Sequence, residues 1–176
     1  GSDRSGERNS RVDRRKFVKL TGAGASVGLA GCIGSIQSGG SDTVKIGAIY
    51  PLTGNVGEIG QRIKKVVNAA ANQIVNKKQS NLKPLVLSEK AGLPNLDGAK
   101  VEVVWADHRG DPAQGRTEAE KMIQQKNVDM LYGCFHSSVS KTVSQVAERE
   151  GIPHVTGESS SPDLTERGLN WFWRTG

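Results

Sequence analysis

Two serine-rich clusters carry the residue types best suited to hold a small charged molecule. Ser137 and Ser138 follow an apolar, strand-like run and stand where a helix is expected to begin, so their hydroxyls and the free amides of the first helical turn can act together as donors. Donors of this kind bind an anion or a strong hydrogen-bond acceptor, such as a carboxylate. Glu158, with Ser159 and Ser160, follows the next strand-like run and adds a carboxylate, whose natural guest is an ammonium group. Together the two clusters suit an α-amino acid.

A structural role for these serines stands beside the ligand hypothesis. Ser137 or Ser138 can cap the helix that begins there, and Ser161 before Pro162 can cap the next one, with proline at the first helical position. We expect capping by at least one serine of each cluster. Ligand binding can coexist with that role.

A nucleophilic or metal site is poorly indicated. Cys134 lies two residues before His136, but this spacing alone makes no catalytic pair, and free cysteines are commonly buried. His108, His136 and His154 are scattered without metal-ligand spacing. We therefore predict that Cys134 is a packing residue, that the protein is not an enzyme, and that it holds no metal or cofactor.

The glycine-rich run at residues 21–31 can be read as a phosphate-binding loop or as part of an export signal. A dinucleotide loop needs G-x-G-x-x-G after a strand, but here the third glycine comes one place late and a basic segment precedes the run. Arg14 and Arg15 begin a stretch that resembles the twin-arginine export motif, and LAGC at 29–32 resembles a lipobox in which Cys32 is acylated. We expect residues 1–32 to be a lipoprotein signal and residues 33–43 to be a Gly/Ser-rich tether.

Most of the basic charge belongs to that signal. The 176 residues carry 24 Lys and Arg against 18 Asp and Glu, a formal net charge of +6. Residues 1–31 hold seven of these cations and three of the anions, which leaves 17 against 15 in the remainder. Such a small excess does not indicate the basic face that nucleic-acid binding requires, so we expect no nucleic-acid partner.

Strand-like and helix-like segments alternate from residue 44 onward. Apolar runs predict strands at residues 44–50, 101–107, 128–133, 151–156 and 171–174. An apolar stripe from Ile63 through Val66 to Ile74 predicts the first helix, Asp111 is a plausible N-cap of the second, and Val139 lies on the inward face of the third. Residues 79–98 read as a long irregular insertion.

This alternation predicts an α/β fold in which a mostly parallel, doubly wound sheet carries helices on both faces. In such a Rossmann-like sheet, ligands bind beyond the carboxyl ends of the strands. Both serine clusters follow strand ends, so we expect them to meet at that edge.

An ordered series of motifs resembles a known family. The motifs are PLTG at 51–54 followed by Gly60, WAD at 105–107, YGCFHSS at 132–138, AEREGIP at 147–153, SPDLTERG at 161–168 and FWRT at 172–175. In this order they are similar to the first lobe of type I periplasmic binding proteins, and within them to the branched-chain amino acid and amide receptors of ABC importers. The resemblance runs from about Val44 to the chain end.

The resemblance implies two lobes joined by a hinge, with the ligand clamped between them and the second lobe absent from residues 44–176. It also implies a receptor that delivers an amino acid to permease subunits. Together with the lipobox at 29–32, we expect this receptor to be extracytoplasmic and lipid-anchored to the outer face of the cytoplasmic membrane, or periplasmic. A small-amide or urea receptor and a ligand-sensing receptor of the same fold are the alternatives. A doubly wound enzyme is the remaining one, since fold does not dictate function.

The resemblance also matches individual residues of this chain to ligand-binding positions of the family. Ser137 matches the family serine that binds the ligand carboxylate, and Glu158 and Ser160 match positions that contact the amino and carboxylate groups. The chain departs from the family at Ile59, where an aromatic residue is common, and at Glu158, where a small residue is usual.

Overall fold

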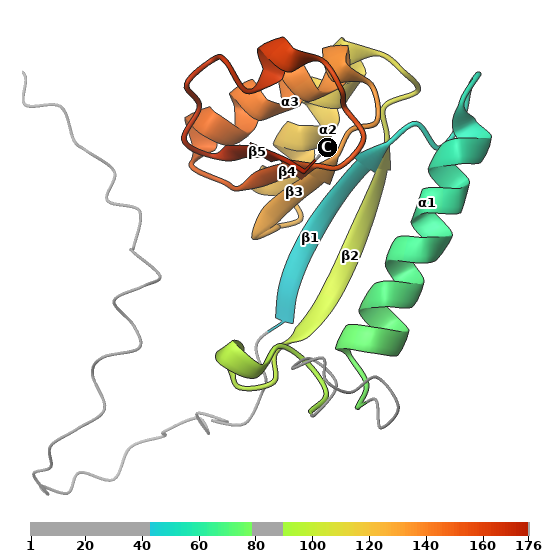
Figure 1. Cartoon of the computed structure of the whole chain (residues 1–176), viewed down its shortest axis with the longest axis vertical. Helices are drawn as coiled ribbons and strands as arrows, with labels where there is room; N and C mark the ends of the chain where they lie inside the picture. The colour runs from blue at the N-terminus through green and yellow to red at the C-terminus, as the bar shows by residue number, and fades with distance from the viewer. Residues whose placement is uncertain (1–42, 79–89, 176) are drawn as a thin grey trace, which may run out of the picture. The chain divides into compact units, whose positions relative to one another are not determined.

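The computed structural model describes residues 43–78 and 90–175 (Figure 1). The predicted export signal with Arg14, Arg15 and Cys32 lies outside the described residues, as do residues 33–42 of the predicted tether. Residues 79–89 of the predicted insertion lie outside them as well. Both serine clusters belong to the described part of the chain.

Five parallel strands form one sheet in the order β2-β1-β3-β4-β5. The strands are β1 (Thr43–Tyr50), β2 (Lys100–Asp107), β3 (Met130–Gly133), β4 (His154–Thr156) and β5 (Phe172–Arg174). From β1 the chain passes to β2 on one side, and then to β3, β4 and β5 on the other. The reversal lies between β1 and β3, and open α/β sheets bind ligands beyond the carboxyl ends of the strands at such a point.

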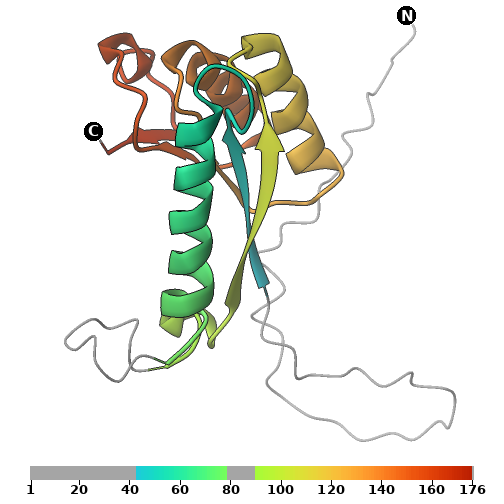
Figure 2. The ribbon, with the colours of Figure 1, turned by 90° about the vertical axis from the view of Figure 1, so that its right-hand side faces the viewer.

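Helices cover both faces of the sheet. Helix α1 runs along one face, whereas α2 and α3 lie on the other (Figure 2). The helical segments are α1 (Gly57–Ala69) with its π-helical continuation η2 (Ala70–Val75), η4 (Pro94–Leu96), α2 (Pro112–Gln124), α3 (Ser137–Glu150) and η5 (Pro162–Leu164). The predicted doubly wound α/β fold is confirmed.

Helix α2 begins after Asp111, the residue predicted to be its N-cap. A side-chain oxygen of Asp111 accepts a 2.9 Å hydrogen bond from the amide of Gln114, and Pro112 occupies the first helical position. The end of α3 is a glycine cap, because Gly151 adopts a positive φ of 64° that a side chain would disfavour. These caps place the two helices relative to the strands they join.

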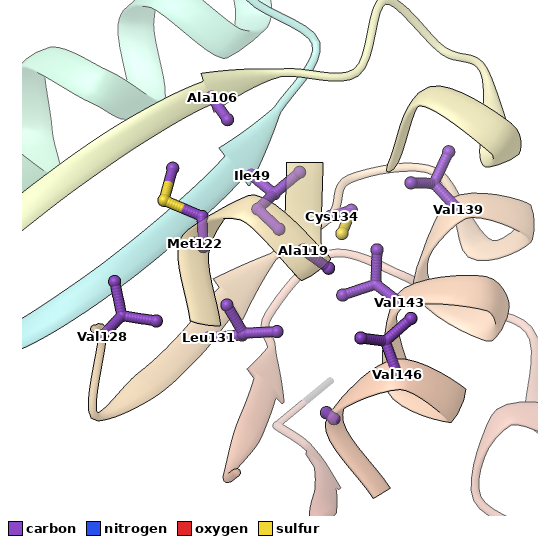
Figure 3. Close-up of a cluster of buried hydrophobic side chains, with 11 residues drawn as sticks. Ile49, Ala106, Ala119, Met122, Val128, Leu131, Cys134, Val139, Val143 and Val146 are labelled. Carbon is purple, nitrogen blue, oxygen red and sulfur yellow. The ribbon is translucent and has the colours of Figure 1, made fainter. Parts of the chain in front are cut away.

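The apolar core lies between the sheet and the helices α2 and α3 (Figure 3). Ile49 of β1 and Leu131 of β3 are fully buried in one cluster with Val143 of α3. Val139 is buried, as predicted, together with further residues of α2 and α3, whereas Ile123 of α2 is partly buried against the same cluster; the buried residues are Ala119, Met122, Val143, Val146 and Ala147. Cores of this kind form because burying apolar surface is favourable.

The apolar stripe of α1 is only partly covered. Ala71 is buried, but Val66 is 68% exposed and Ile74 is 38% exposed. Helix α1 lies beside β1 and β2 (Figures 1 and 2), and the exposed fractions show that the stripe is covered only in part. The stripe correctly predicts the helix, but Val66 and Ile74 remain exposed, because periodicity locates an apolar face without showing how wide a surface covers it.

Two strands, β3 and β4, begin two and three residues later than predicted. Val128 is buried, but its amide donates to the carbonyl of Met122 near the end of α2 and closes that helix, so β3 begins at Met130. Strand β4 begins at His154, after Pro153, which has no amide hydrogen to donate to a sheet. Both shifts shorten the strands at their amino ends and leave the carboxyl ends, where the serine clusters lie, as predicted.

Candidate ligand-binding site

The loops after β1, β3 and β4 gather polar groups at the reversal point of the sheet. Strand β1 ends at Tyr50, β3 leads through Gly133 into Ser137 at the start of α3, and β4 leads into Glu158. Because all the strands are parallel, these ends share one edge of the sheet. The two serine clusters therefore meet there, as their positions after strands predicted.

The loop after β1 is held by a close approach between backbone segments. A side chain at Gly60, on the first turns of α1, would overlap the carbonyl oxygen of Pro51. The amide side chain of Gln61 donates to the carbonyl of Leu52 at 3.0 Å. These contacts fix α1 against the end of β1 and leave Ile59 42% exposed beside the loop.

Tyr50 and Glu158 form a hydrogen-bonded pair across the reversal point. The Tyr50 hydroxyl donates toward the Glu158 carboxylate, with its oxygen 2.9 Å from Oε2 and 3.2 Å from Oε1. The ring of Tyr50 is fully buried, with its centroid 5.6 Å from that of Tyr132 and 5.9 Å from that of Trp105. Burial, with the Tyr132 hydroxyl and the Glu158 charge adding to it, raises the pKa of Tyr50, so the phenol stays protonated.

The carboxylate of Glu158 lacks an ion-pair partner within residues 43–78 and 90–175. Glu158 is half-buried, and no Lys, Arg or His of these residues forms an ion pair with it. One phenol donor satisfies only part of a carboxylate, which offers about four lone-pair sites. The edge of the sheet therefore presents a fixed carboxylate with acceptor capacity to spare.

Ser137 occupies the first position of α3 and does not cap it. The helix begins after His136, which makes no side-chain cap bond, and the Ser137 hydroxyl instead accepts a 3.2 Å hydrogen bond from the amide of Ser161. This bond ties the start of α3 to the loop after β4. In the first turn of α3 the Val139 amide donates to the carbonyl of His136 at 3.1 Å, whereas the amides of Ser137 and Ser138 precede the intrahelical bonds and can act as donors for an anion.

The remaining predicted site residues divide between rim and interior. Ser138 and Ser160 are exposed on the rim. The hydroxyl of Ser159 is buried; it lies 2.6 Å from that of Ser140 and donates to the carbonyl of Cys134 at 3.1 Å. Ser159 thus fastens the loop after β4 to the segment between β3 and α3, while its neighbours face outward.

The structure also tests the predicted helix cap at Ser161. Ser161 precedes Pro162, which takes the first position of the short helical turn η5, as expected. The Ser161 hydroxyl donates to the carboxylate of Asp163 and makes no cap bond to the backbone. The expectation that at least one serine of each cluster caps a helix is wrong, because neither α3 nor η5 has a side-chain cap bond; the two clusters are instead joined by the bond from the Ser161 amide to the Ser137 hydroxyl.

A second group of polar residues lies at the same edge; Thr53 and Asp107 belong to the PLTG and WAD motifs, but the sequence assigned them no role. The Asp107 carboxylate accepts bonds from the amides of Leu52 and Arg109, both at 2.9 Å, and from the Thr53 hydroxyl. Burial alone raises the pKa of Asp107, but these hydrogen bonds, led by that from Thr53, outweigh it and lower the pKa below its usual value. The ionised Asp107 joins the loops after β1 and β2.

A pocket of about 340 Å³ opens beside that network. Its walls come from the loops after β1, β2 and β3, and the lining residues are Thr53, Gly54, Asn55, Val56, Arg109, Gly110 and His136. His136 immediately precedes Ser137, so the pocket adjoins the first serine cluster. No periodic or motif signal singles out Arg109, because only the folded sheet brings the loops after β1, β2 and β3 together.

Two of the scattered histidines prove to be neighbours. The rings of His108 and His136 stand edge to face with centroids 5.4 Å apart. His108 is fully buried, and burial first, then the proximity of His136, lowers its pKa to about 4. In the part of the chain that the structure describes, no three His, Cys, Asp or Glu side chains lie close enough to hold one metal ion.

Cys134 is a core residue, as predicted. Its side chain is fully buried in the cluster formed by β1, β3, α2 and α3. Burial raises the pKa of the Cys134 thiol, so it remains protonated, whereas a nucleophilic cysteine needs a thiolate. The arrangement favours binding of a small molecule at the edge of the sheet over covalent chemistry at this residue.

A family model described as "Periplasmic binding protein" matches residues 43–176. The chain belongs to this family. A relative within it, the Leu/Ile/Val-binding protein homolog 3 of Brucella melitensis, is 32% identical over 151 residues, which cover 86% of this chain and 36% of the relative. This periplasmic binding protein chain thus spans about a third of the relative's length.

Solved structures agree with that assignment. A leucine-binding protein, LivK, of Thermotoga maritima is 26% identical with a TM-score of 0.58, covering 75% of this chain and 32% of that one. A solute-binding protein of an ABC transporter from Rhodopseudomonas palustris, solved with 3,4-dihydroxybenzoic acid, is 20% identical with a TM-score of 0.61, covering 76% and 31%. The second likeness shows the fold alone.

Membership of this family implies an extracytoplasmic location. Of the helices in the described part of the periplasmic binding protein chain, none has the length and apolar character needed to cross a membrane.

Proposed function

We propose that this chain is the N-terminal ligand-binding lobe of an extracytoplasmic solute-binding receptor of an ABC importer. The receptor binds a branched-chain or other amino acid in a cleft between this lobe and a second one, and delivers it to the permease subunits. The family match and the Leu/Ile/Val-binding relative support this proposal. The relatives' greater length supports the second lobe.

The observation that carries the proposal is the meeting of donors and a carboxylate at the reversal point. The amides at the start of α3 and the Ser137 hydroxyl bind the ligand carboxylate, and Glu158 binds the ammonium group. Ser138 and Ser160 add exposed hydroxyls at the rim. Ser159 takes part from the interior, where its hydroxyl holds the loop that carries Glu158 and Ser160.

Closure depends on contacts with both lobes. The ligand binds this lobe first and stabilises the closed form, because only that form also provides the contacts of the second lobe. A ligand of this kind shifts the population of closed receptor that the permease recognises.

The proposal includes anchoring of the receptor to the outer face of the cytoplasmic membrane. Residues 1–32 act as a twin-arginine lipoprotein signal, Cys32 is acylated, and residues 33–43 serve as the tether. The Cys32→Ala variant is expected to leave the membrane fraction, and the double variant Arg14→Lys with Arg15→Lys is expected to remain inside the cell. Retention of Cys32→Ala in the membrane fraction contradicts the anchor.

The experiment that tests the function is thermal unfolding of the complete protein without residues 1–32 against a panel of ligands. The panel contains branched-chain and other amino acids, simple amides, urea and nucleotides. A ligand at hundredfold excess over its dissociation constant adds roughly 3 kcal/mol to the stability of the native state, which raises the unfolding midpoint. A shift with amino acids supports the proposal, and a shift with amides or urea alone supports the amide receptor instead. A shift with nucleotides alone, or none, contradicts both receptors.

A further inference from the structure

Tyr50 lies outside both serine clusters, yet its hydroxyl holds the Glu158 carboxylate. The two residues are 108 positions apart in the sequence and are joined by a hydrogen bond of 2.9 Å. The bond crosses from the end of β1 to the loop after β4, over the end of β3. The carboxylate is thereby held where the strand order reverses, between β1 and β3.

The hydrogen bond between Tyr50 and Glu158 can have only one direction. The buried phenol stays protonated, so it always acts as the donor and the carboxylate as the acceptor. Removing the Glu158 carboxylate would leave a buried hydroxyl without this acceptor, which is unfavourable. The rings of Tyr132 and Trp105 beside Tyr50 limit its movement, so the hydroxyl has a fixed position. Glu158 is therefore directed by a rigid partner.

A fixed carboxylate without a counter-charge favours a cation. Burying a charge is costly unless it is paired, and Glu158 is half-buried with no ion pair among the described residues. A ligand ammonium group would supply the missing positive charge and use the lone pairs that Tyr50 leaves free. The fold by itself does not require a ligand with an ammonium group, because a protein of similar fold was solved with 3,4-dihydroxybenzoic acid, which has none.

We propose that Tyr50 is a positioning residue that holds the Glu158 carboxylate at the rim, so that the site selects ligands carrying a cationic nitrogen over the same acids without one. This inference rests on the proposed function. It adds a residue from β1 to the site and assigns the ligand selectivity to one hydrogen-bonded pair.

The competing role for the pair is a structural tie between β1 and the loop after β4. A tie of that kind predicts a lower unfolding midpoint when the bond is lost, with equal effects on all ligands. The selectivity between two ligands that differ only in the ammonium group separates the two roles. Leucine and 4-methylpentanoate are such ligands, because they share the carboxylate and the side chain.

The experiment measures the dissociation constants of leucine and 4-methylpentanoate by calorimetry, using the complete protein without residues 1–32. The variants are Tyr50→Phe, which keeps the ring, Glu158→Gln, which keeps the shape, and the double variant. Thr117→Val serves as control, since it removes a hydroxyl that donates to the carbonyl of Ala113 within α2. The unfolding midpoint of each variant is recorded alongside.

The expected result is a preference for leucine in the wild type that falls about tenfold or more in Glu158→Gln. Tyr50→Phe is expected to lower the preference severalfold, mainly by weakening leucine, and the double variant is expected to match Glu158→Gln. That last equality is the signature of a residue that acts through Glu158. Thr117→Val is expected to keep the wild-type preference.

An unchanged preference in Tyr50→Phe, with leucine bound by the wild type, overturns the positioning role and leaves the proposed function standing. An unchanged preference in Glu158→Gln overturns the inference by an independent variant, even where Tyr50→Phe folds poorly. A wild type that binds no amino acid at all overturns the proposed function and this inference together.

Discussion

The hydroxyls of Ser140 and Ser159 lie 2.6 Å apart inside the protein and join α3 to the loop after β4. Ser159 also donates to the carbonyl of Cys134, and Ser140 accepts from the Cys134 amide at 3.1 Å. This small network decides which side chains of the second serine cluster face the proposed binding site. With Ser159 turned inward, Glu158 and Ser160 on either side of it are displayed at the edge of the sheet.

Ser159→Ala is expected to destabilise the protein by about 1–2 kcal/mol, because Ser140 and the Cys134 carbonyl lose a buried partner. Ser160→Ala is the matched control, since Ser160 is exposed and its loss is expected to change stability by less than about 0.5 kcal/mol. Urea unfolding followed by circular dichroism measures both. Equal stability of the two variants would contradict the structural role of Ser159.

His154 makes stability depend on pH. The side chain is fully buried, its Nε2 lies 2.7 Å from the carbonyl oxygen of Gly133, and burial lowers its pKa to about 4. The unfolded chain takes up a proton near pH 6.5 and the folded chain only near pH 4, so stability is complete above pH 6.5 and falls as the pH drops toward 4. Over this window the loss is roughly 3 kcal/mol for this group.

The check is urea unfolding at several values between pH 7 and pH 4, on the wild type and on His154→Gln. The variant is expected to be less stable at pH 7 and to show a shallower decline, because one proton-binding group of the unfolded state is gone. His108, whose pKa is also lowered to about 4, accounts for a remaining part of the slope. A decline of equal steepness in wild type and variant would rule out His154 as a source.

Cys134 is expected to resist alkylation in the folded protein. The chain contains two cysteines, so a protein beginning after Cys32 keeps Cys134 as the only thiol of these 176 residues. Its full burial and raised pKa remove both access and thiolate. Mass spectrometry after iodoacetamide treatment is expected to find modification of Cys134 only once the protein is unfolded in urea. Rapid labelling of the native protein would show that the thiol is accessible.

The strands and helices were predictable because local patterns encode them. The apolar runs ending at Tyr50 and Asp107 and the stripe of Val139, Val143 and Val146 each reflect burial of one face, which sequence periodicity reports directly. The position of both serine clusters at the carboxyl edge came from parallel strands alone. The resemblance to a known family agreed with this edge as the site.

The contacts within the site were not predictable in the same way. The Tyr50–Glu158 bond depends on the order of the strands, which no local pattern states, and it joins residues 108 positions apart. The inward turn of Ser159 depends on Ser140, because only the folded loop brings the two hydroxyls together. Val66 shows an error of the other kind, in which a sequence pattern indicates burial that the structure lacks, because the sheet does not cover this position.

The decisive measurement is a calorimetric titration of leucine into the complete protein without residues 1–32, in the wild type and in Ser137→Ala. We expect one site per protein in the wild type and an affinity about tenfold weaker or more in Ser137→Ala, because a charge-assisted hydrogen bond to the ligand carboxylate is lost. Thr142→Ala, which removes a hydroxyl that donates to the carbonyl of Ser138 within α3, is expected to bind as the wild type does. Wild-type affinity in Ser137→Ala would contradict the site, and absence of leucine and other amino acid binding in the wild type would contradict the function.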